Sequence, residues 1–93
     1  MMTYVVCYDI EDDRERLRVA RCLESIGERV QYSVFEVHLR NASELNRLQT
    51  ALKAIVGNNS QDIRFYRLTA DALAASACLN GDPVAIKPAF IVI

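Results

Sequence analysis

Residues 3–9 read Thr-Tyr-Val-Val-Cys-Tyr-Asp, a β-branched and aromatic run that is apolar on both faces until it ends in a carboxylate. This composition is typical of a central β-strand that is covered on both sides. After this strand the apolar residues change to a helical spacing, and residues 11–26 follow the pattern of an amphipathic helix. Asp9 or the pair Asp12–Asp13 suits the N-terminus of this helix, and Gly27 is a natural C-terminal stop. The apolar stripe of the helix consists of Val19, Cys22, Leu23 and Ile26.

Strand and helix patterns follow the first helix. Residues 29–40 are rich in β-branched residues and predict two short strands, or one strand bent around Gln31–Tyr32. Residues 42–56 predict a second helix, since leucine, isoleucine and valine recur at helical spacing. Asn41 and Glu44 form a capping pair at the start of that helix.

The C-terminal part predicts four further features. They are a turn at residues 57–60, a strand at 62–68, a short helix within the Ala-rich stretch 70–79, and an apolar terminal strand at about 83–93. The order β-α-β-β-α-β with an extra strand predicts an α/β (α+β) ferredoxin-like sandwich, which we expect to form one domain over residues 1–93. An apolar terminal strand is a hazard at a free sheet edge, so we expect it to pack on the partner chain of a two-fold homodimer.

The overall composition is that of a globular domain. The chain has 93 residues, 25% charged residues and a formal net charge of −1. No apolar run approaches the roughly 20 residues of a membrane span, and the N-terminus shows no signal peptide. The net charge alone does not predict nucleic-acid binding. Nine of the eleven basic residues are arginine, whose planar donor fork matches phosphate oxygens, although a GC-rich coding bias explains this count equally well.

Several kinds of functional site are not expected. Cys7, Cys22 and Cys78 fit neither a zinc pattern nor a disulfide framework. Cys7 and Cys22 fall within apolar patterns, which predicts buried free thiols and a cytoplasmic location. His38 is the only histidine and lies in a predicted strand, so chemistry centred on histidine is not expected. The sequence also lacks the Walker A, H-E-x-x-H, G-x-S-x-G and G-x-G-x-x-G motifs.

Asp9 is the most informative single residue. It ends an apolar strand, and carboxylates at strand ends often face a ligand. The alternative role for Asp9 is the N-cap of the following helix. One aspartate per chain is a thin metal site, but Mg²⁺ commonly takes one or two carboxylates and keeps several waters. In a two-fold dimer, two copies of Asp9 could therefore share one Mg²⁺ that activates water to attack a phosphodiester.

The first predicted helix carries several arginines. Arg14, Arg18 and Arg21 follow i, i+4, i+7 spacing on its polar side and could line a phosphate track. The alternative is a solvated face on which these arginines alternate with glutamates. Arg16 lies toward the apolar stripe, where it could snorkel or point at the mouth near Asp9.

Two blocks of sequence resemble a known family. These are Tyr8-Asp9-Ile10-x-Asp12-Asp13 and Gly27-x-Arg29-Val30-Gln31-Tyr32-Ser33-Val34-Phe35-Glu36, and together they resemble the smaller core adaptation protein of CRISPR systems, the Cas-two family. Residues 63–68 look like the strand that follows in this family, so the resemblance covers residues 3–68. It implies a ferredoxin-like homodimer whose C-terminal strands pack on the partner's sheet.

The resemblance also implies an activity. Family members are magnesium-dependent endonucleases that act on RNA or double-stranded DNA, and Mn²⁺ is an alternative metal here. They also bridge two dimers of the larger adaptation integrase during spacer acquisition. By resemblance Asp9 is the metal-binding aspartate, and Tyr8 flanks the metal position. The other positions implicated in the activity are Arg16, Arg18, Arg29, Ser33 and Phe35.

Two hypotheses of different class follow. In the first, the chain is a metal-dependent nuclease in which paired Asp9 side chains hold Mg²⁺ while Arg16 and Arg18 hold the nucleic-acid backbone. In the second, the chain is a non-catalytic adaptor that presents Arg14, Arg18 and Arg21 to a DNA duplex and docks an integrase at each end. A regulator that binds a small ligand is less favoured, because no Gly-rich ligand loop is present.

Overall fold

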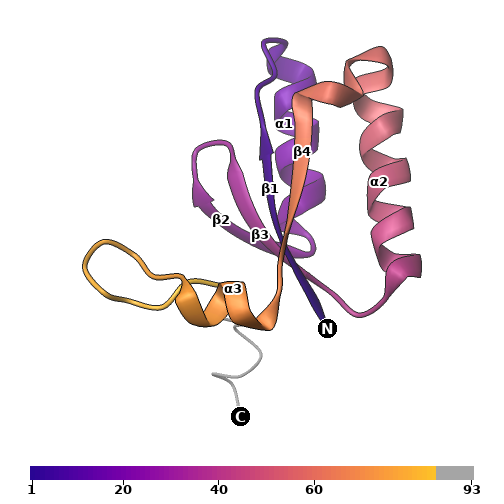
Figure 1. Cartoon of the computed structure of the whole chain (residues 1–93). Helices are drawn as coiled ribbons and strands as arrows, with labels where there is room; N and C mark the ends of the chain where they lie inside the picture. Colours follow the sequence, from indigo (N-terminus) through magenta and orange to yellow (C-terminus); the bar gives the residue numbers. More distant parts are fainter. Residues whose placement is uncertain (86–93) are drawn as a thin grey trace.

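Four strands form one antiparallel sheet in the order β2-β3-β1-β4 in the computed structural model, which describes residues 1–85 (Figure 1). The strands are β1 (Met2–Tyr8), β2 (Gly27–Gln31), β3 (Val34–Leu39) and β4 (Ile63–Leu68). As predicted, β1 is an interior strand, and it pairs with β3 on one side and β4 on the other. Because two helices connect these strands in the expected order, the predicted ferredoxin-like fold is confirmed.

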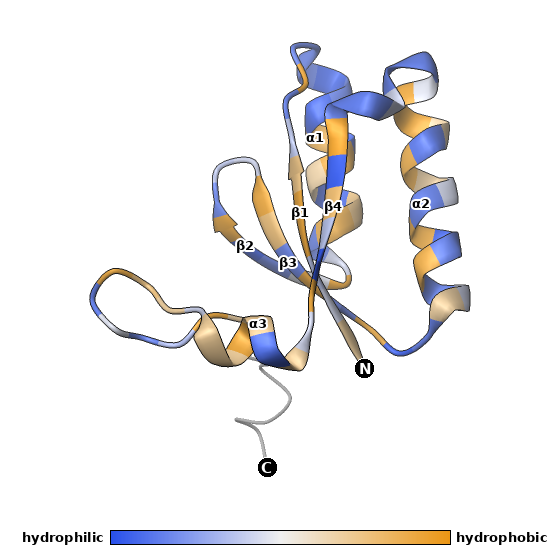
Figure 2. Cartoon of the chain, in the orientation of Figure 1, coloured by the Kyte–Doolittle hydropathy of each residue, from blue (hydrophilic) through white to orange (hydrophobic). Residues whose placement is uncertain are grey.

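The core lies between the sheet and two helices, α1 (Asp13–Glu24) and α2 (Ala42–Val56). Along both helices apolar and polar segments alternate, as an amphipathic helix requires (Figure 2). Side chains from alternate positions of the strands meet the apolar faces of the helices. The side chains with no exposed surface are Val6, Val19, Leu23, Phe35 and Val37.

The other face of the sheet is less covered than predicted. Val5 and Cys7 alternate with the buried Val6 and are only half-buried within the described part of the chain. The chain returns to this face at Ala85, whose amide donates a hydrogen bond of 3.0 Å to the Glu36 carboxylate. The prediction that β1 is covered on both sides is therefore confirmed for the helix-facing side, and on the other side only for the buried Thr3.

The first helix, the turn after the second helix and the Ala-rich stretch differ in bounds or type from what the sequence predicted. The first helix begins at Asp13 rather than at residue 11, because Asp12 is its N-cap, and it ends two residues before the predicted end. The predicted turn after α2 is a 3₁₀ helix, η1 (Gly57–Asp62). The Ala-rich stretch forms α3 (Ala70–Ala75), which is shorter than the stretch itself.

The terminal strand predicted at about 83–93 falls almost wholly outside the described residues. Within its described part, Pro83 forms only an isolated bridge with Ala77.

The second helix begins and ends where the sequence predicted. The Asn41 side chain caps it by accepting a hydrogen bond of 3.0 Å from the Glu44 amide. The other half of the expected capping pair is displaced by one residue. The Glu44 carboxylate accepts from the backbone N–H and from Nε of Arg40, at 2.8 and 2.9 Å. These two hydrogen bonds lower the pKa of Glu44.

The β2–β3 hairpin depends on Gly27, where β2 begins. A Cβ atom at this position would lie 2.3 Å from the carbonyl oxygen of Glu36 and 2.9 Å from Cα of Val37. Backbone atoms of the neighbouring strand therefore leave room only for glycine. The register of the hairpin shifts between Arg29 and Gln31, as at a β-bulge. Of the two alternatives predicted for residues 29–40, two short strands are observed.

The composition predicted buried free thiols and no membrane span, and the structure can be compared with both expectations. Cys7 and Cys22 are half-buried free thiols rather than fully buried ones, and Cys78 is exposed. Burial raises the pKa of the Cys22 thiol. None of the helices within residues 1–85 is long and apolar enough to cross a membrane.

Candidate metal and nucleic-acid site

Asp9 follows β1 directly and is exposed. Its amide donates a hydrogen bond of 3.0 Å to the carbonyl oxygen of Asp62, which ties the end of β1 to the start of β4. Its carboxylate has no hydrogen bond or ion pair with any other residue of the described chain. The N-cap of α1 is instead Asp12, whose side chain accepts from the Glu15 amide at 2.9 Å. The capping role that was the alternative for Asp9 therefore belongs to Asp12.

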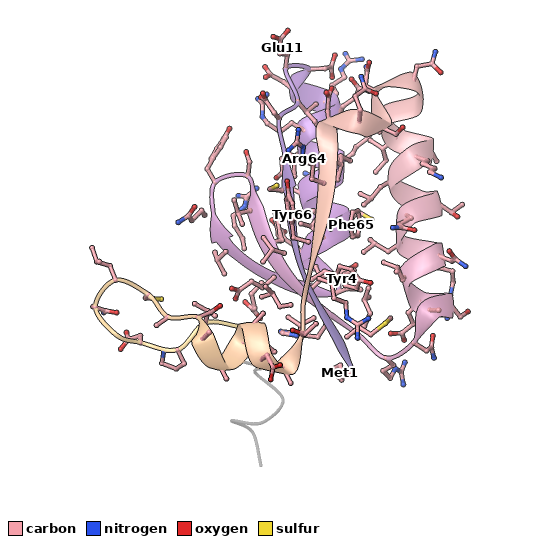
Figure 3. All side chains as sticks on the ribbon, in the orientation of Figure 1. Met1, Tyr4, Glu11, Arg64, Phe65 and Tyr66 are labelled. Atoms are coloured by element: carbon pink, nitrogen blue, oxygen red, sulfur yellow. The ribbon has the colours of Figure 1, made fainter. Side chains whose placement is uncertain are left out.

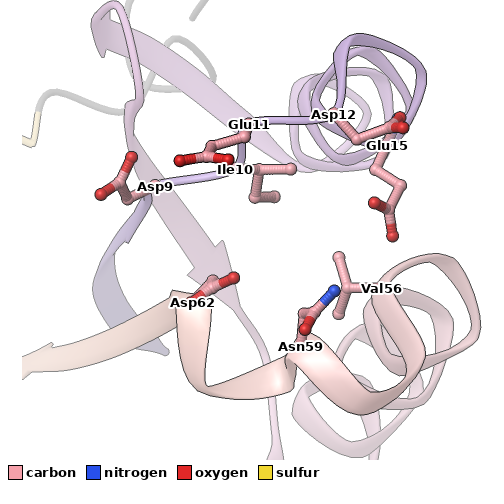
Figure 4. A pocket seen from close by; sticks show the side chains of 8 residues that line it. All are labelled: Asp9, Ile10, Glu11, Asp12, Glu15, Val56, Asn59 and Asp62. Atoms are coloured by element: carbon pink, nitrogen blue, oxygen red, sulfur yellow. The ribbon is translucent and has the colours of Figure 1, made fainter.

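An open cleft of about 620 Å³ lies beside Asp9, between the β1–α1 loop and η1 (Figure 4). Five of its eight lining residues carry carboxylates, and they come from both walls of the cleft. The lining residues are Asp9, Ile10, Glu11, Asp12, Glu15, Val56, Asn59 and Asp62. Such a surface attracts cations and repels phosphate unless a cation is present.

A second cavity of about 400 Å³ adjoins Asp9 on the other side and is lined by a positively charged side chain. Arg64 and Tyr66 line it, and the Arg64 guanidinium donates a hydrogen bond of 3.1 Å to the Tyr66 hydroxyl (Figure 3). Neither residue was among the site residues predicted from the sequence. A usable signal was present, because Arg64 and Tyr66 alternate with the apolar Ile63 and Phe65 and so share the sheet face that the helices leave open.

The residues around Asp9 offer oxygen donors, which hard divalent cations prefer. Within residues 1–85 no group of three or more His, Cys, Asp or Glu side chains is arranged to hold a metal ion. Asp9 thus offers a free carboxylate without belonging to such a group, and the Glu11, Glu15 and Asp62 carboxylates of the same cleft also lack ion pairs among the described residues. This donor set fits an ion such as Mg²⁺, which accepts one or two carboxylates and keeps several waters, and it does not fit a closed site such as structural zinc.

Arg14, Arg18 and Arg21 all lie exposed on α1. The sequence left open whether glutamates of the same helix neutralise them. Among the described residues the two ion pairs are Arg16–Asp13 and Arg40–Glu44, so none of the three arginines is paired. Their guanidinium groups are therefore available to an external anion.

Arg16 differs from its neighbours on α1 because it is half-buried and turned toward the β1–α1 loop. Its Nη1 donates to the carbonyl oxygens of Ile10 and Glu11, at 3.0 and 3.2 Å. Its Nη2 donates to the Asp13 carboxylate. This hydrogen bond raises the pKa of the Arg16 guanidinium. Of the two orientations considered from the sequence, the one toward the mouth near Asp9 is the one observed.

Arg29, Ser33 and Phe35 lie together on the β2–β3 hairpin. The Arg29 guanidinium carbon lies 5.3 Å from the centre of the fully buried Phe35 ring. The Phe35 ring in turn stacks on Tyr8, with ring centres 6.3 Å apart. Ser33 contributes its carbonyl oxygen, which accepts from the Tyr8 amide at 3.1 Å. The hairpin residues therefore converge on Tyr8, the residue before Asp9.

These features define a class of protein. A ferredoxin-like sheet ends its first strand in an unengaged carboxylate, and its first helix exposes three unpaired arginines. Such a molecule is a small α+β protein with a free acidic group at a strand end and free cationic groups on its first helix.

Comparisons with known proteins identify the family. The profile for CRISPR associated protein Cas2 matches residues 2–75. The CRISPR-associated endoribonuclease Cas2 3 of Synechocystis sp. is 43% identical over 88 residues, which are 95% of this chain and 94% of that protein. The chain therefore belongs to the Cas2 family, as the sequence resemblance implied.

Solved structures agree with this assignment. One chain of a structure described as a partial Cas6-RT-Cas1–Cas2 complex superposes with a TM-score of 0.84 at 34% identity, covering 94% of this chain and all of that one. The crystal structure of a hypothetical protein, TT1823, from Thermus thermophilus superposes with a TM-score of 0.65 at 36% identity. That match covers 73% of this chain and 82% of the other.

Proposed function

We propose that this chain is a metal-dependent endonuclease that hydrolyses phosphodiester bonds of RNA or double-stranded DNA as a homodimer. One observation carries the proposal: the Asp9 carboxylate is exposed beside an open cleft, unengaged by any described residue, while Asp12 performs the capping role. The name endoribonuclease borne by the Synechocystis relative supports the same activity. A cytoplasmic location, expected from the free thiols, is part of this proposal.

In the proposed mechanism, the Asp9 carboxylates from two copies would together hold one Mg²⁺ or Mn²⁺. When bound, such an ion orients a water and offsets charge on the scissile phosphate. The chain's own contribution is to bind and orient the substrate. Arg18 on α1 binds the phosphate backbone, because its guanidinium is exposed and unpaired. The acidic cleft beside Asp9 disfavours nucleic acid in the absence of a cation, which makes binding at this point depend on the metal.

Metal removal tests this proposal. Purified protein is incubated with labelled single-stranded RNA and with double-stranded DNA, in EDTA and then with excess Mg²⁺ or Mn²⁺. We expect no cleavage in EDTA and cleavage of at least one substrate after the metal is restored. The comparison of the two substrates gives the preferred nucleic acid. Cleavage that continues unchanged in EDTA contradicts a metal-dependent mechanism.

A second candidate function is a non-catalytic adaptor that binds DNA and joins an integrase. Two observations favour it. Arg14, Arg18 and Arg21 form an unpaired cationic row on α1. The structural neighbour that covers nearly the whole chain comes from a complex whose description includes Cas1. We propose that the homodimer docks the larger CRISPR adaptation integrase and presents this row to the duplex.

Charge reversal tests the adaptor function. The triple variant Arg14→Glu, Arg18→Glu and Arg21→Glu is expected to lose spacer acquisition in cells and to bind duplex DNA more weakly. The slope of log K against log salt should become shallower by about 0.9 for each phosphate contact that is lost. Arg47→Glu, a single charge reversal of the same kind on the exposed surface of α2, is the control for position. Retained acquisition in the triple variant counts against the adaptor function.

A further inference from the structure

We propose that Arg16 is a positioning residue, which holds the loop carrying Asp9 in place and does not itself contact nucleic acid. This inference rests on the proposed nuclease function, because it assigns Arg16 a role in the same site. It also gives Arg16 a different role from Arg18, whereas the sequence predicted that both residues hold the nucleic-acid backbone.

The Arg16 guanidinium already donates three hydrogen bonds to other residues of the chain. An arginine side chain has five N–H donors and no acceptor. Three contacts of Arg16 end on the segment between β1 and the first turn of α1, namely the carbonyl oxygens of Ile10 and Glu11 and the carboxylate of Asp13. A guanidinium that binds this many protein acceptors has few donors left for a phosphate. Replacing it with a small side chain removes the described partners of two loop carbonyl groups.

The carbonyl groups that accept hydrogen bonds from Arg16 lie directly after Asp9 in the chain. Ile10 and Glu11 directly follow Asp9, so a hydrogen bond to their carbonyl groups fixes the direction in which the chain leaves β1. On the other side of the site the Asp9 amide is bound to the Asp62 carbonyl. The Asp9 backbone is therefore held from α1 and from η1, while its carboxylate stays unengaged. A metal ligand needs this kind of support, because small displacements of a ligand weaken the site.

Residues of the β2–β3 hairpin also pack against Tyr8, the residue before Asp9. The Arg29 guanidinium lies over both the Tyr32 ring and the Phe35 ring, at 5.9 and 5.3 Å from their centres. Phe35 stacks on Tyr8, and Arg29, Tyr32 and Tyr8 line one cavity together with Arg16. Contacts thus run from the hairpin to Tyr8, the residue before Asp9, and hairpin residues share a cavity with Arg16.

Arg18 provides the contrast. It lies two residues after Arg16 on the same helix, is exposed, and makes no ion pair or hydrogen bond with another described side chain. Two residues correspond to about 200° around an α-helix, so Arg16 and Arg18 face in different directions. The geometry assigns Arg16 to the loop and leaves Arg18 to the substrate.

The test compares Arg16→Ala, Arg18→Ala and the control Arg47→Ala as full-length proteins. Amide exchange is measured by NMR in EDTA, and affinity for RNA and duplex DNA is measured in the same buffer. In Arg16→Ala the Asp9 amide should exchange faster by about tenfold or more, because the loop opens more easily, while nucleic-acid affinity stays within about twofold of wild type. In Arg18→Ala the affinity should fall while Asp9 exchange is unchanged. Arg47→Ala should change neither measurement.

Cleavage kinetics add a measurement that general destabilisation does not reproduce. With Mg²⁺, Arg16→Ala should lower kcat by about tenfold or more with KM nearly unchanged, and free guanidinium ion should restore part of the rate. Weakened nucleic-acid binding in Arg16→Ala, with normal Asp9 exchange, would overturn the proposal and make Arg16 a substrate contact. The exchange measurement does not depend on cleavage. A wild-type protein that shows no metal-dependent cleavage would therefore refute the nuclease function separately from the role of Arg16.

Discussion

Asp9→Asn is expected to reduce metal-dependent cleavage by at least about a hundredfold while the fold and the dimer persist. The amide has nearly the shape of the carboxylate but lacks its charge, so it is a much poorer ligand for a hard cation. A catalytic metal contributes several kcal/mol to transition-state stabilisation, and each loss of about 1.4 kcal/mol lowers the rate tenfold. The backbone hydrogen bond from Asp9 to Asp62 does not involve the side chain and should remain. Single-turnover cleavage with excess Mg²⁺ measures the effect, and light scattering follows the dimer.

Asp12→Asn is the matched control for Asp9→Asn, because it changes a carboxylate three residues away in the same loop. Asp12 caps α1, and asparagine is about as good an N-cap as aspartate. We expect this variant to keep wild-type stability and most of the cleavage activity. Equal cleavage by Asp9→Asn and wild type would place the activity elsewhere in the chain or in a contaminating nuclease.

Local patterns in the sequence were sufficient for most of the fold. The bounds of α2 were predicted correctly, because its apolar repeat is regular, Asn41 supplies a cap and Gly57 stops the helix. Residues 29–40 predicted either two short strands or one bent strand, and the structure has two strands, the first of which begins at Gly27 rather than at residue 29. The start of α1 was less certain because Asp9, Asp12 and Asp13 all suit a helix N-terminus. Only the backbone path shows which carboxylate reaches the amides of the first turn.

The functional roles needed three-dimensional information or a family resemblance. From the residues alone, Asp9 suited either a helix cap or a metal site shared across a dimer, and the family resemblance favoured the proposed metal site. The direction of Arg16 was not fixed by helical spacing, because a long side chain at the edge of an apolar stripe can turn either way. Arg64 was overlooked because the sequence does not show that β4 begins next to Asp9. The net charge of −1 was also a poor guide, because it averages an acidic cleft with a separate cationic row on α1.

Phe35→Ala is expected to lower the free energy of unfolding by about 3–5 kcal/mol, the usual cost of removing a fully buried phenylalanine ring. Phe35 has no exposed surface, and both the stacking partner Tyr8 and the guanidinium of Arg29 pack against it. Domains of this size are stable by only about 5–15 kcal/mol, so a substantial part of this margin would be lost. Urea denaturation followed by circular dichroism measures the change, and the midpoint should fall strongly.

This expected loss of stability bears on the role that the family resemblance implied for Phe35. Lost cleavage in Phe35→Ala would follow from unfolding and would not show that the ring touches substrate. Phe35→Leu fills much of the same volume and should cost only about 1.5 kcal/mol or less, as near-isosteric core changes do. The leucine variant should therefore stay folded and cleave nucleic acid in Mg²⁺ at a rate close to wild type. A fully stable Phe35→Ala protein that has lost cleavage would contradict this interpretation, because a ring that the fold does not need would then have to act on the substrate directly.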